Sequence, residues 1–344
     1  MDIDAIVARN APTACKGILL AVGMSGAVIF GVAIDSPAMS PFAAFGAMTA
    51  MQITPRHGVM ARIAGALAGC LFLLLAASLS VAAAGYPLLA LIILFVLSWL
   101  AALPKKDLAY LGFAAKCAAM AVLLSYFDFT PSLAMALYFC AGIILGIFLS
   151  LTAMAFEKEN QASPLAQLRA LLRGDINNPY FSLLTPATVL VTSMLAKLLS
   201  YSNPAWVGLT VIFVADSDDR LELRRLLDRV IGTMAGAMVS YLILSHIHLP
   251  LRLALIAGAL AFFVPFAIRY YSLFSMLLTC IVLVLVNIAM LGRGGDMGLL
   301  SWRCIDTVLG CLGVLVSNII LQCIYWCKRR YSQKAHAGTN QDGR

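Results

Sequence analysis

Apolar runs of about 18 residues or more recur from one end of the chain to the other, and each is long enough to cross about 30 Å of hydrocarbon. Inside a bilayer the backbone polar groups of a segment must be satisfied by protein, which leaves α-helices or a closed β-barrel. The runs are continuous and do not alternate with a period of two, so they exclude barrel strands. The sequence therefore predicts an all-α integral membrane protein.

Charge is scarce in this chain. Only 12% of its residues are charged, against roughly 25% in a soluble domain, so we expect membrane lipids around most of it. The formal net charge is +8, but no nucleic-acid motif accompanies it, and we predict no nucleic-acid partner. The nine cysteines are scattered through the apolar runs, as small buried hydrophobes are. No GxxxxGK[ST], GxSxG or HExxH motif occurs, so we predict no enzymatic activity, no cofactor and no metal.

Proline, glycine and charged residues divide the apolar runs into twelve predicted spans. The spans cover residues 12–34, 37–53, 58–83, 87–103, 108–126, 131–155, 181–201, 204–215, 222–245, 250–268, 271–291 and 301–326. The predicted organisation is a first six-helix transmembrane repeat over 1–155, a cytoplasmic linker over 156–180, a second six-helix repeat over 181–327 and a basic cytoplasmic tail over 328–344.

The positions of Lys and Arg test this segmentation, because cytoplasmic loops carry an excess of both residues. With twelve spans and a cytoplasmic N-terminus, most of the Lys and Arg fall in inside loops. A wrong number of spans would reverse the side of every later loop. The pattern therefore predicts a multi-pass protein with both termini in the cytoplasm.

The two halves of the chain resemble each other. Residues 36–39 read SPAM and residues 203–206 read NPAW, while residues 62–69 read RIAGALAG and residues 229–236 read RVIGTMAG. Both pairs are separated by the same offset, since 204 − 37 = 167 and 229 − 62 = 167. Each half has an even number of predicted spans, so the two repeats would run parallel, related by an axis along the membrane normal.

The second span of each half is short and begins with proline at its outside end. Pro37 and Pro41 begin the first of these spans, and Pro204, followed by Trp206, begins the other. Short or Pro-interrupted segments at matching positions of two repeats indicate the central site of a transporter, where helix N-termini attract an anion. We predict that these four residues bind substrate. The alternative is that proline here is ordinary helix-start chemistry.

The third span of each half carries an arginine and two glycines at matching positions. Glycines four residues apart let two helices approach closely, so we predict a structural role in helix packing for this motif. Its residues are Arg62, Gly65 and Gly69 in the first half, and Arg229, Gly232, Thr233 and Gly236 in the second.

Lys116 is the charged residue that the hydrophobic pattern explains least. It follows Asp107 by nine residues, or about 13.5 Å along a helix that rises 1.5 Å per residue. A Lys near the centre of the hydrocarbon costs at least about 2.5–3.5 kcal/mol, so its side chain should face an interior cavity. There it could hold an anionic substrate or titrate. An ion pair or carbonyl contact that only locks helices together is the alternative.

Arg303 and Asp306 are three residues apart on the last span, so they share a helix face and can pair. An intramembrane Asp is a candidate proton-coupling site in a carrier driven by a gradient. A purely structural pair is the alternative. Asp35, which precedes the first short span, is a further candidate of the same kind.

The segment 203–244 resembles the fusaric-acid-resistance and aromatic-acid-exporter family. It combines a short span containing Trp206, a polar turn, and an R-x-x-G-T-x-x-G helix that begins at Arg229. The start of the last span, residues 301–312, contains RCIDT and is similar to the family's second recurrent pattern. The first half matches more loosely, since Met39 stands where the second half has Trp206.

The resemblance implies a bacterial inner-membrane exporter of aromatic or other weak organic acids, driven by the proton gradient. Its substrates would be small organic anions, and its partner a periplasmic adaptor of the membrane-fusion type. Many family members carry a large soluble domain after each membrane half, where this chain has only short polar segments. Plant malate channels are distant relatives that work as dimers, which keeps open a homodimer and an organic-anion channel. A non-transporting scaffold of an envelope complex is the third hypothesis.

Overall fold

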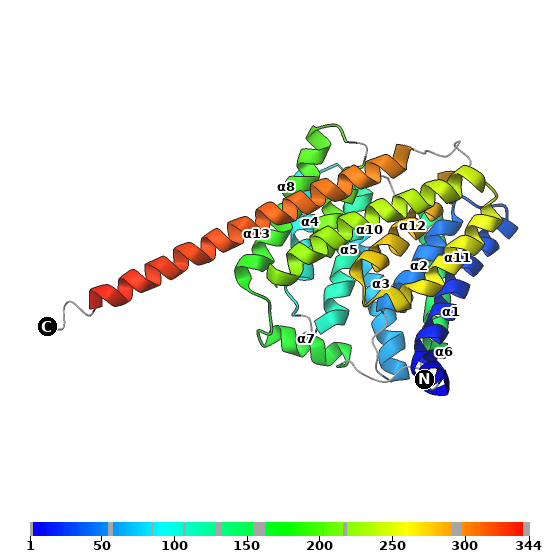
Figure 1. The fold of residues 1–344 in the computed structure, drawn as a ribbon, viewed down its shortest axis with the longest axis horizontal. Coiled ribbons are helices and arrows are strands. Elements are labelled where there is room, and N and C mark those ends of the chain that lie inside the picture. Colours follow the sequence, from blue (N-terminus) through cyan, green and yellow to red (C-terminus); the bar gives the residue numbers. More distant parts are fainter. Residues whose placement is uncertain are drawn as a thin grey trace.

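The computed structural model describes residues 3–53, 58–83, 85–105, 108–127, 132–153, 162–201, 203–215, 219–290 and 298–339. Several predicted loops, including the boundary between residues 155 and 156, lie outside these ranges. The described residues form thirteen α-helices (Figure 1): α1 (Ile3–Ala33), α2 (Ser40–Ile53), α3 (Val59–Ala82), α4 (Pro87–Ala102), α5 (Ala109–Phe127), α6 (Leu133–Ala153), α7 (Pro164–Leu172), α8 (Pro179–Leu198), α9 (Pro204–Val214), α10 (Asp219–His246), α11 (Pro250–Ala267), α12 (Tyr271–Met290) and α13 (Gly298–Thr339).

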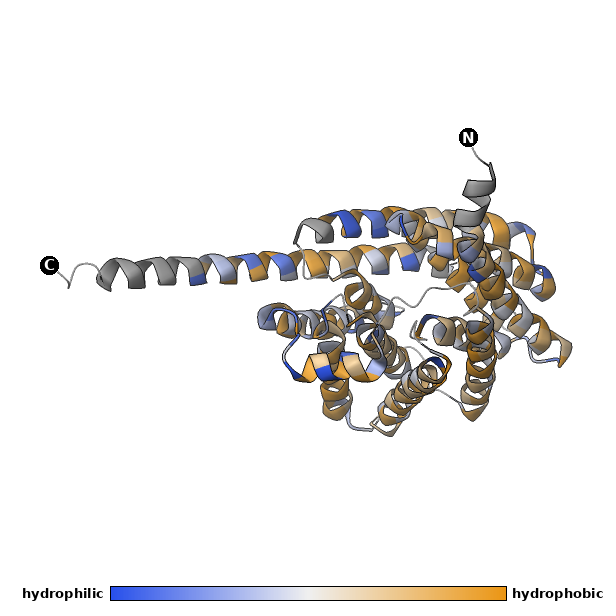
Figure 2. Ribbon diagram, turned by 90° about the horizontal axis from the view of Figure 1, so that it is seen from below, coloured by the Kyte–Doolittle hydropathy of each residue, from blue (hydrophilic) through white to orange (hydrophobic). Residues whose placement is uncertain are grey.

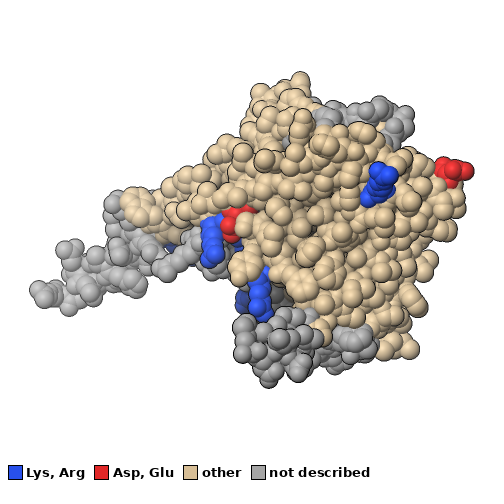
Figure 3. Space-filling model, turned by 45° about the vertical axis from the view of Figure 1, so that its right-hand side comes forward, with Lys and Arg blue, Asp and Glu red and all other residues tan. Residues whose placement is uncertain are grey.

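The helices have the length and the surface of membrane spans. Within the described residues, nine helices are long and apolar enough to cross a bilayer, and apolar residues dominate nearly every helix (Figure 2). Large apolar side chains face outward, among them Phe148 at 63% exposed and Ile144 at 70%. The face in Figure 3 shows charged side chains at only a few places. The prediction of an all-α membrane protein with multiple spans is confirmed, whereas the number of twelve crossings stays a prediction.

Three of the predicted spans correspond to short helices. α2 has 14 residues, α4 has 16 and α9 has 11, so α9 rises only about 16.5 Å at 1.5 Å per residue. The short second span of each half therefore agrees with the sequence prediction. α2 begins at Ser40, and Pro37 lies in the preceding turn, where its carbonyl accepts a hydrogen bond from the Ser40 hydroxyl.

Proline sets the start of many helices. Five of the described helices (α4, α7, α8, α9 and α11) have proline at their first position. Proline is favoured there because the first N–H groups of a helix have no partner within the helix. Ser163 and Asn178 also cap α7 and α8 with their side-chain oxygens.

The structure departs from the predicted organisation in two segments. The linker contains α7, which the sequence analysis treated only as polar chain; Ser163 caps it and Pro164 begins it. The predicted tail is helical over much of its length, because α13 runs for 42 residues and continues to Thr339. No proline interrupts residues 301–337, and α13 extends well beyond the helical body (Figure 1).

Helices of the first predicted half pack against helices of the second. α1 packs on α11 and α8 packs on α4, while α5 reaches α9 and α12 reaches α2. Two large apolar clusters result, and each draws on both halves. The first cluster centres on α1, α2, α11 and α12, and the second on α4, α5, α8, α9 and α13. The arrangement of two parallel repeats remains a prediction, which these reciprocal contacts support.

The close packing of α2 on α6 generates a test. A Cβ added at Gly146 would lie 2.8 Å from the Cβ of Ala50 and still closer to the Ala47 carbonyl oxygen. We expect Gly146→Ala to lower the free energy of unfolding by about 1–3 kcal/mol because it overpacks this contact. Thermal unfolding of the purified protein would measure the change.

Gly26 supplies the matched control for this experiment. It also lies inside an apolar helix, but nothing lies within 4 Å of the position that its Cβ would take. Gly26→Ala should therefore leave the melting temperature unchanged or raise it, since Ala is about 1 kcal/mol better than Gly in a helix. Equal melting temperatures for both variants would contradict the close approach at Gly146.

Candidate functional site

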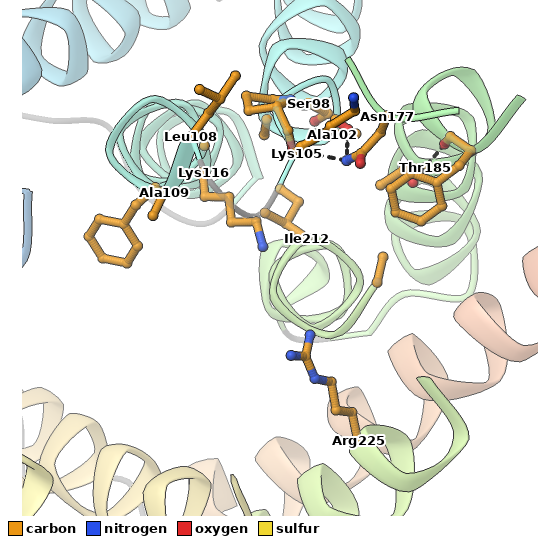
Figure 4. Close-up of a pocket in the computed structure, with 16 residues that line it drawn as sticks. Ser98, Ala102, Lys105, Leu108, Ala109, Lys116, Asn177, Thr185, Ile212 and Arg225 are labelled. Carbon is orange, nitrogen blue, oxygen red and sulfur yellow. Dashed lines mark hydrogen bonds between the residues drawn. The ribbon is translucent and has the colours of Figure 1, made fainter. Parts of the chain in front are cut away.

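A cavity of about 280 Å³ opens among α4, α5, α8 and α9 and reaches Arg225 of α10 (Figure 4). Its size lies at the lower end of the range for small-molecule sites. The residues that line it are Ser98, Ala101, Ala102, Pro104, Lys105, Leu108, Ala109, Gly112, Phe113, Lys116, Asn177, Phe181, Thr185, Ile212, Ala215 and Arg225. The cavity thus takes residues from both predicted halves.

Among the described residues that line the cavity, the charged ones are Lys105, Lys116 and Arg225, all cationic. Lys116 projects from the middle of α5 toward α9, and its Nζ lies 6.0 Å from the ring centroid of Phe213. Arg225 extends toward the end of α9 from the opposite direction (Figure 4). Lys105 also lines the cavity, and its Nζ lies 3.4 Å from a carboxylate oxygen of Asp175. With Lys116 and Arg225 directed at its lining, the cavity favours an anion.

Polar and aromatic groups complete the lining. Asn177 donates hydrogen bonds from its amide nitrogen to the carbonyls of Ala102 and Pro104, both at 2.9 Å, and so joins the linker to the end of α4. The Thr185 hydroxyl donates to the Phe181 carbonyl at 2.9 Å. Phe113 and Phe181 present aromatic surface. Cations beside aromatic surface suit a small anion with an apolar body.

The structure separates the predicted substrate-binding residues. Lys116 lines the cavity, whereas Pro37, Pro41, Pro204 and Trp206 are not among the lining residues. The cavity adjoins the C-terminal end of α9, while Pro204 and Trp206 lie at its N-terminal end. Trp206 precedes Phe213 by seven residues, or about 10.5 Å along the helix. The N-terminal end of α9 and Lys116 therefore lie at different places along this helix.

A second charged group lies at the N-terminal end of α9. The Cζ of Arg303 is 4.3 Å from the ring centroid of Trp206, a cation–π contact, and Arg303 is only 7% exposed. Asp306 and Thr307 of α13 are also buried, at 1% and 0% exposed. The helix approaches α9 closely here, because Gly310 lies against Val207 and Thr210. Trp206 thus contacts a charged side chain of the predicted coupling group.

Asp35 lies apart from these groups. It is exposed in the turn between α1 and α2 and has a φ of 55°. Asp tolerates this left-handed conformation better than most residues. Ser200 has a similar φ of 58° in the turn between α8 and α9. The structure therefore accounts for Asp35 through the turn that it forms.

The repeated arginine and glycine motif lies where helices pack together. Gly232 and Gly236 face the backbone of α12 closely enough that a Cβ at either would collide with it. In the first half, the Tyr110 hydroxyl donates to the carbonyl of Gly65 at 2.6 Å. Gly69 contacts Ile53, and Thr233 is fully buried.

The two arginines of this motif are buried as well. Arg62 is 1% exposed and donates from Nη1 to the Ser150 carbonyl at 3.3 Å, while Arg229 is 5% exposed. Arg62 thereby connects α3 to α6. These contacts place the arginines among packed helices.

Sequence reasoning missed Arg225, Lys105 and Asn177 as site residues. The two cations were interpreted as charges of cytoplasmic loops, and Asn177 falls in the predicted linker. Their place at the cavity depends on long-range contacts, such as the hydrogen bond from the Asn177 backbone N–H to the Leu103 carbonyl. The sequence signal for Lys105 was its position just before the span that carries Lys116.

The described part of the chain brings together no group of three His, Cys, Asp or Glu side chains that could hold a metal ion. The described residues that line the cavity likewise include no His, Cys, Asp or Glu. Among them, Lys, Arg and neutral donors are the groups that can recognise an anion.

Comparison with known families gives a match over part of the chain. Residues 189–317 match the sequence model of a family described as fusaric acid resistance protein-like. The match contains residues 203–244 and 301–312, which carry the resemblance noted in the sequence, and it confirms that resemblance. Comparison with curated proteins and with solved structures gives no match. The family match and the apolar helices together indicate a membrane transporter.

Proposed function

From the match of residues 189–317 to the fusaric acid resistance protein-like family, we propose that this membrane protein exports aromatic or other weak organic acids. The proposed location is the bacterial inner membrane, and the proposed driving force is the proton gradient. The observation that carries the proposal is Lys116, a cation in the middle of an apolar helix that lines a cavity together with Arg225.

The cavity supports an anionic substrate with an apolar body. A Lys in the hydrocarbon region costs at least about 2.5–3.5 kcal/mol, so its presence there calls for a compensating role. A carboxylate bound between Lys116 and Arg225 would gain charge-assisted hydrogen bonds. Phe113 and Phe181 would contact an aromatic ring.

The predicted orientation supports export. It places the loop that contains Lys105 and the linker that contains Asn177 in the cytoplasm. The mouth of the cavity would then face the compartment from which an exporter takes its substrate. Arg303 and Asp306 would lie toward the outside, at the far end of α9.

Asp306 is the proposed proton-coupling residue. Its side chain is 1% exposed, and among the described residues its Oδ1 has no hydrogen-bond partner. An ionised carboxylate is costly in such surroundings, and protonation removes that cost. A proton that binds and leaves Asp306 could therefore change which arrangement of α13 and α9 is favoured.

We expect Lys116→Ala to abolish coupled export, because the cavity would lose its central cation. The measurement uses proteoliposomes loaded with a panel of aromatic carboxylates and given an imposed pH gradient. Lys197→Ala is the matched control. Lys197 also lies in an apolar helix and contacts the rings of Tyr126 and Phe127, but it is not among the residues that line the cavity.

The wild type and the Lys197→Ala variant should both move at least one acid when the gradient is imposed. Anion movement that needs no gradient would instead indicate a channel. An absence of flux in all vesicles would contradict the exporter and favour a scaffold, unless addition of an adaptor protein restored it.

Asp306→Asn should separate transport from its coupling. The amide is close in size to the carboxylate but cannot exchange a proton, so gradient-driven accumulation should fall by about tenfold or more, a change of about 1.4 kcal/mol. Exchange of labelled for unlabelled substrate at equal pH on both sides should persist. Unchanged accumulation in the Asp306→Asn variant would exclude this residue as the coupling site.

A further inference from the structure

α2 and α9 occupy matching positions in the two halves. Each is the second helix of its half and follows a turn with a left-handed residue, Asp35 before α2 and Ser200 before α9. α2 packs on α1, α6 and α12, and α9 packs on α8, α13 and α5, which are the equivalent helices. The two helices therefore have equivalent neighbours.

The glycine contacts of the two helices are similar, with the contacting glycines one residue out of the repeat register, since 310 − 142 = 168. Gly142 of α6 lies against the Ala43 carbonyl of α2, and Gly310 of α13 lies against Thr210 of α9. Ala43 and Thr210 are separated by the offset of the sequence repeat, since 210 − 43 = 167. This agreement allows one side of the molecule to serve as an internal control for the other.

The charges around the two helices differ. α5 brings Lys116 to the C-terminal end of α9, and α13 brings Arg303 to its N-terminal end. The equivalent helices beside α2 are α12 and α6, and neither contains a Lys, Arg, Asp or Glu. Of these four helices, α5 and α13 carry charged residues, among which Lys116 and Arg303 lie beside α9.

Other charged residues on the helices either occur in both halves or lie near the end of a span. Arg62 and Arg229 occur at the same repeat position in α3 and α10, so they belong to the architecture that the halves share. Lys16 of α1 and Lys197 of α8 have no counterpart, but each lies near an end of its candidate span, where a long side chain can reach the interface. Lys116, Arg225, Arg303 and Asp306 remain as charged residues beside α9 that have no charged counterpart in the other half.

The α2 side folds with apolar residues at the equivalent positions. Residues 281–286 of α12 read IVLVLV. Leu283, the counterpart of Lys116, is buried in a small apolar cluster with Ala237, while Ile281, Val284 and Leu285 belong to the first apolar cluster. The same helix arrangement therefore does not require a charge at these positions. The helix arrangement alone does not explain why Lys116, Arg303 and Asp306 are charged. What these residues share is a position beside α9.

We propose that the chain contains a single anion pathway, which runs along α9, and that the equivalent α2 side has only a structural role. The inference rests on the proposed function and specifies where that function is located. The anion would enter the cavity at Lys116 and Arg225 and pass toward Arg303. It would meet cations about 10 Å apart along one short helix, the distance from Phe213 to Trp206 at 1.5 Å per residue.

The first test compares thiol accessibility at two equivalent positions. Ile212 lines the cavity on α9, and its counterpart on α2 is Phe45, since 212 − 45 = 167. The probe is a small methanethiosulfonate reagent that carries a sulfonate. It would be applied to vesicles containing Ile212→Cys or Phe45→Cys, and peptide mass would separate the new thiol from the nine native cysteines.

The Ile212→Cys variant should be modified at least about tenfold faster than Phe45→Cys. Adding Lys116→Leu to Ile212→Cys should slow the anionic reagent more than a cationic reagent of the same size, because the cation attracts the probe. Equal labelling at both positions would overturn the single pathway, and gradient-driven flux by the wild type would still leave the exporter standing. If Ile212→Cys is labelled and Phe45→Cys is not, but the wild type shows no gradient-driven flux, the exporter is overturned. The proposal that only the α9 side is accessible would then still stand.

The second test uses stability and does not depend on the cysteine variants. If Lys116 serves the pathway and not the fold, Lys116→Leu should melt at or above the wild-type temperature while coupled transport is lost. Arg62→Leu and Arg229→Leu, which alter the shared architecture, should both lower the melting temperature. A fall in the melting temperature of Lys116→Leu as large as that of Arg62→Leu would overturn the proposal.

Discussion

The length of α9 is the constraint on which the rest of the structure depends. Eleven residues rise about 16.5 Å, about half of a hydrocarbon layer of about 30 Å. Both ends of this helix must therefore be enclosed by protein, because lipid cannot satisfy free backbone groups. α5, α8, α10 and α13 surround it, and nine of its eleven residues are buried. The cavity adjoins one end of α9, and the group of Arg303 and Trp206 lies at the other.

Aromatic rings accompany the cations that lie in the apolar helices. Lys116 lies near Phe213, Lys197 near Tyr126 and Phe127, and Arg303 over Trp206. A cation over a ring is stabilised by about 2 kcal/mol or more when water is excluded. This is comparable to the insertion cost of a charged residue, about 2.5–3.5 kcal/mol. A ring can thus offset much of the cost of holding a cation in the interior.

Much of the fold could be predicted from the sequence, because membrane spans depend on local composition. The apolar runs, the prolines at helix starts and the glycine faces are all local signals, and they correspond to helices and helix contacts in the structure. α7 was not predicted because the residues around it are polar. The continuation of α13 was not predicted because the charged residues after its apolar part were taken to end the helix.

The site could be predicted only in part. Lys116 was identifiable because a charge within an apolar helix stands out. Arg225 and Asn177 were not, since their position at the cavity depends on how α8, α9 and α10 pack. Trp206 was predicted to bind substrate, which stays a prediction; the structure places it at the N-terminal end of α9, against Arg303. No local signal specifies which side chain a tryptophan will contact across two helices.

Direct binding tests the central claim, that Lys116 and Arg225 form an anion site. The thermal unfolding of the purified wild type and of Lys116→Ala would be compared in benzoate and in benzamide, which has nearly the same shape but no charge. The account predicts that benzoate stabilises the wild type, by about 2.7 kcal/mol at one hundred times its Kd, and that it has little effect on the variant or when replaced by benzamide. Equal stabilisation by benzamide, or equal stabilisation of the variant by benzoate, would contradict it.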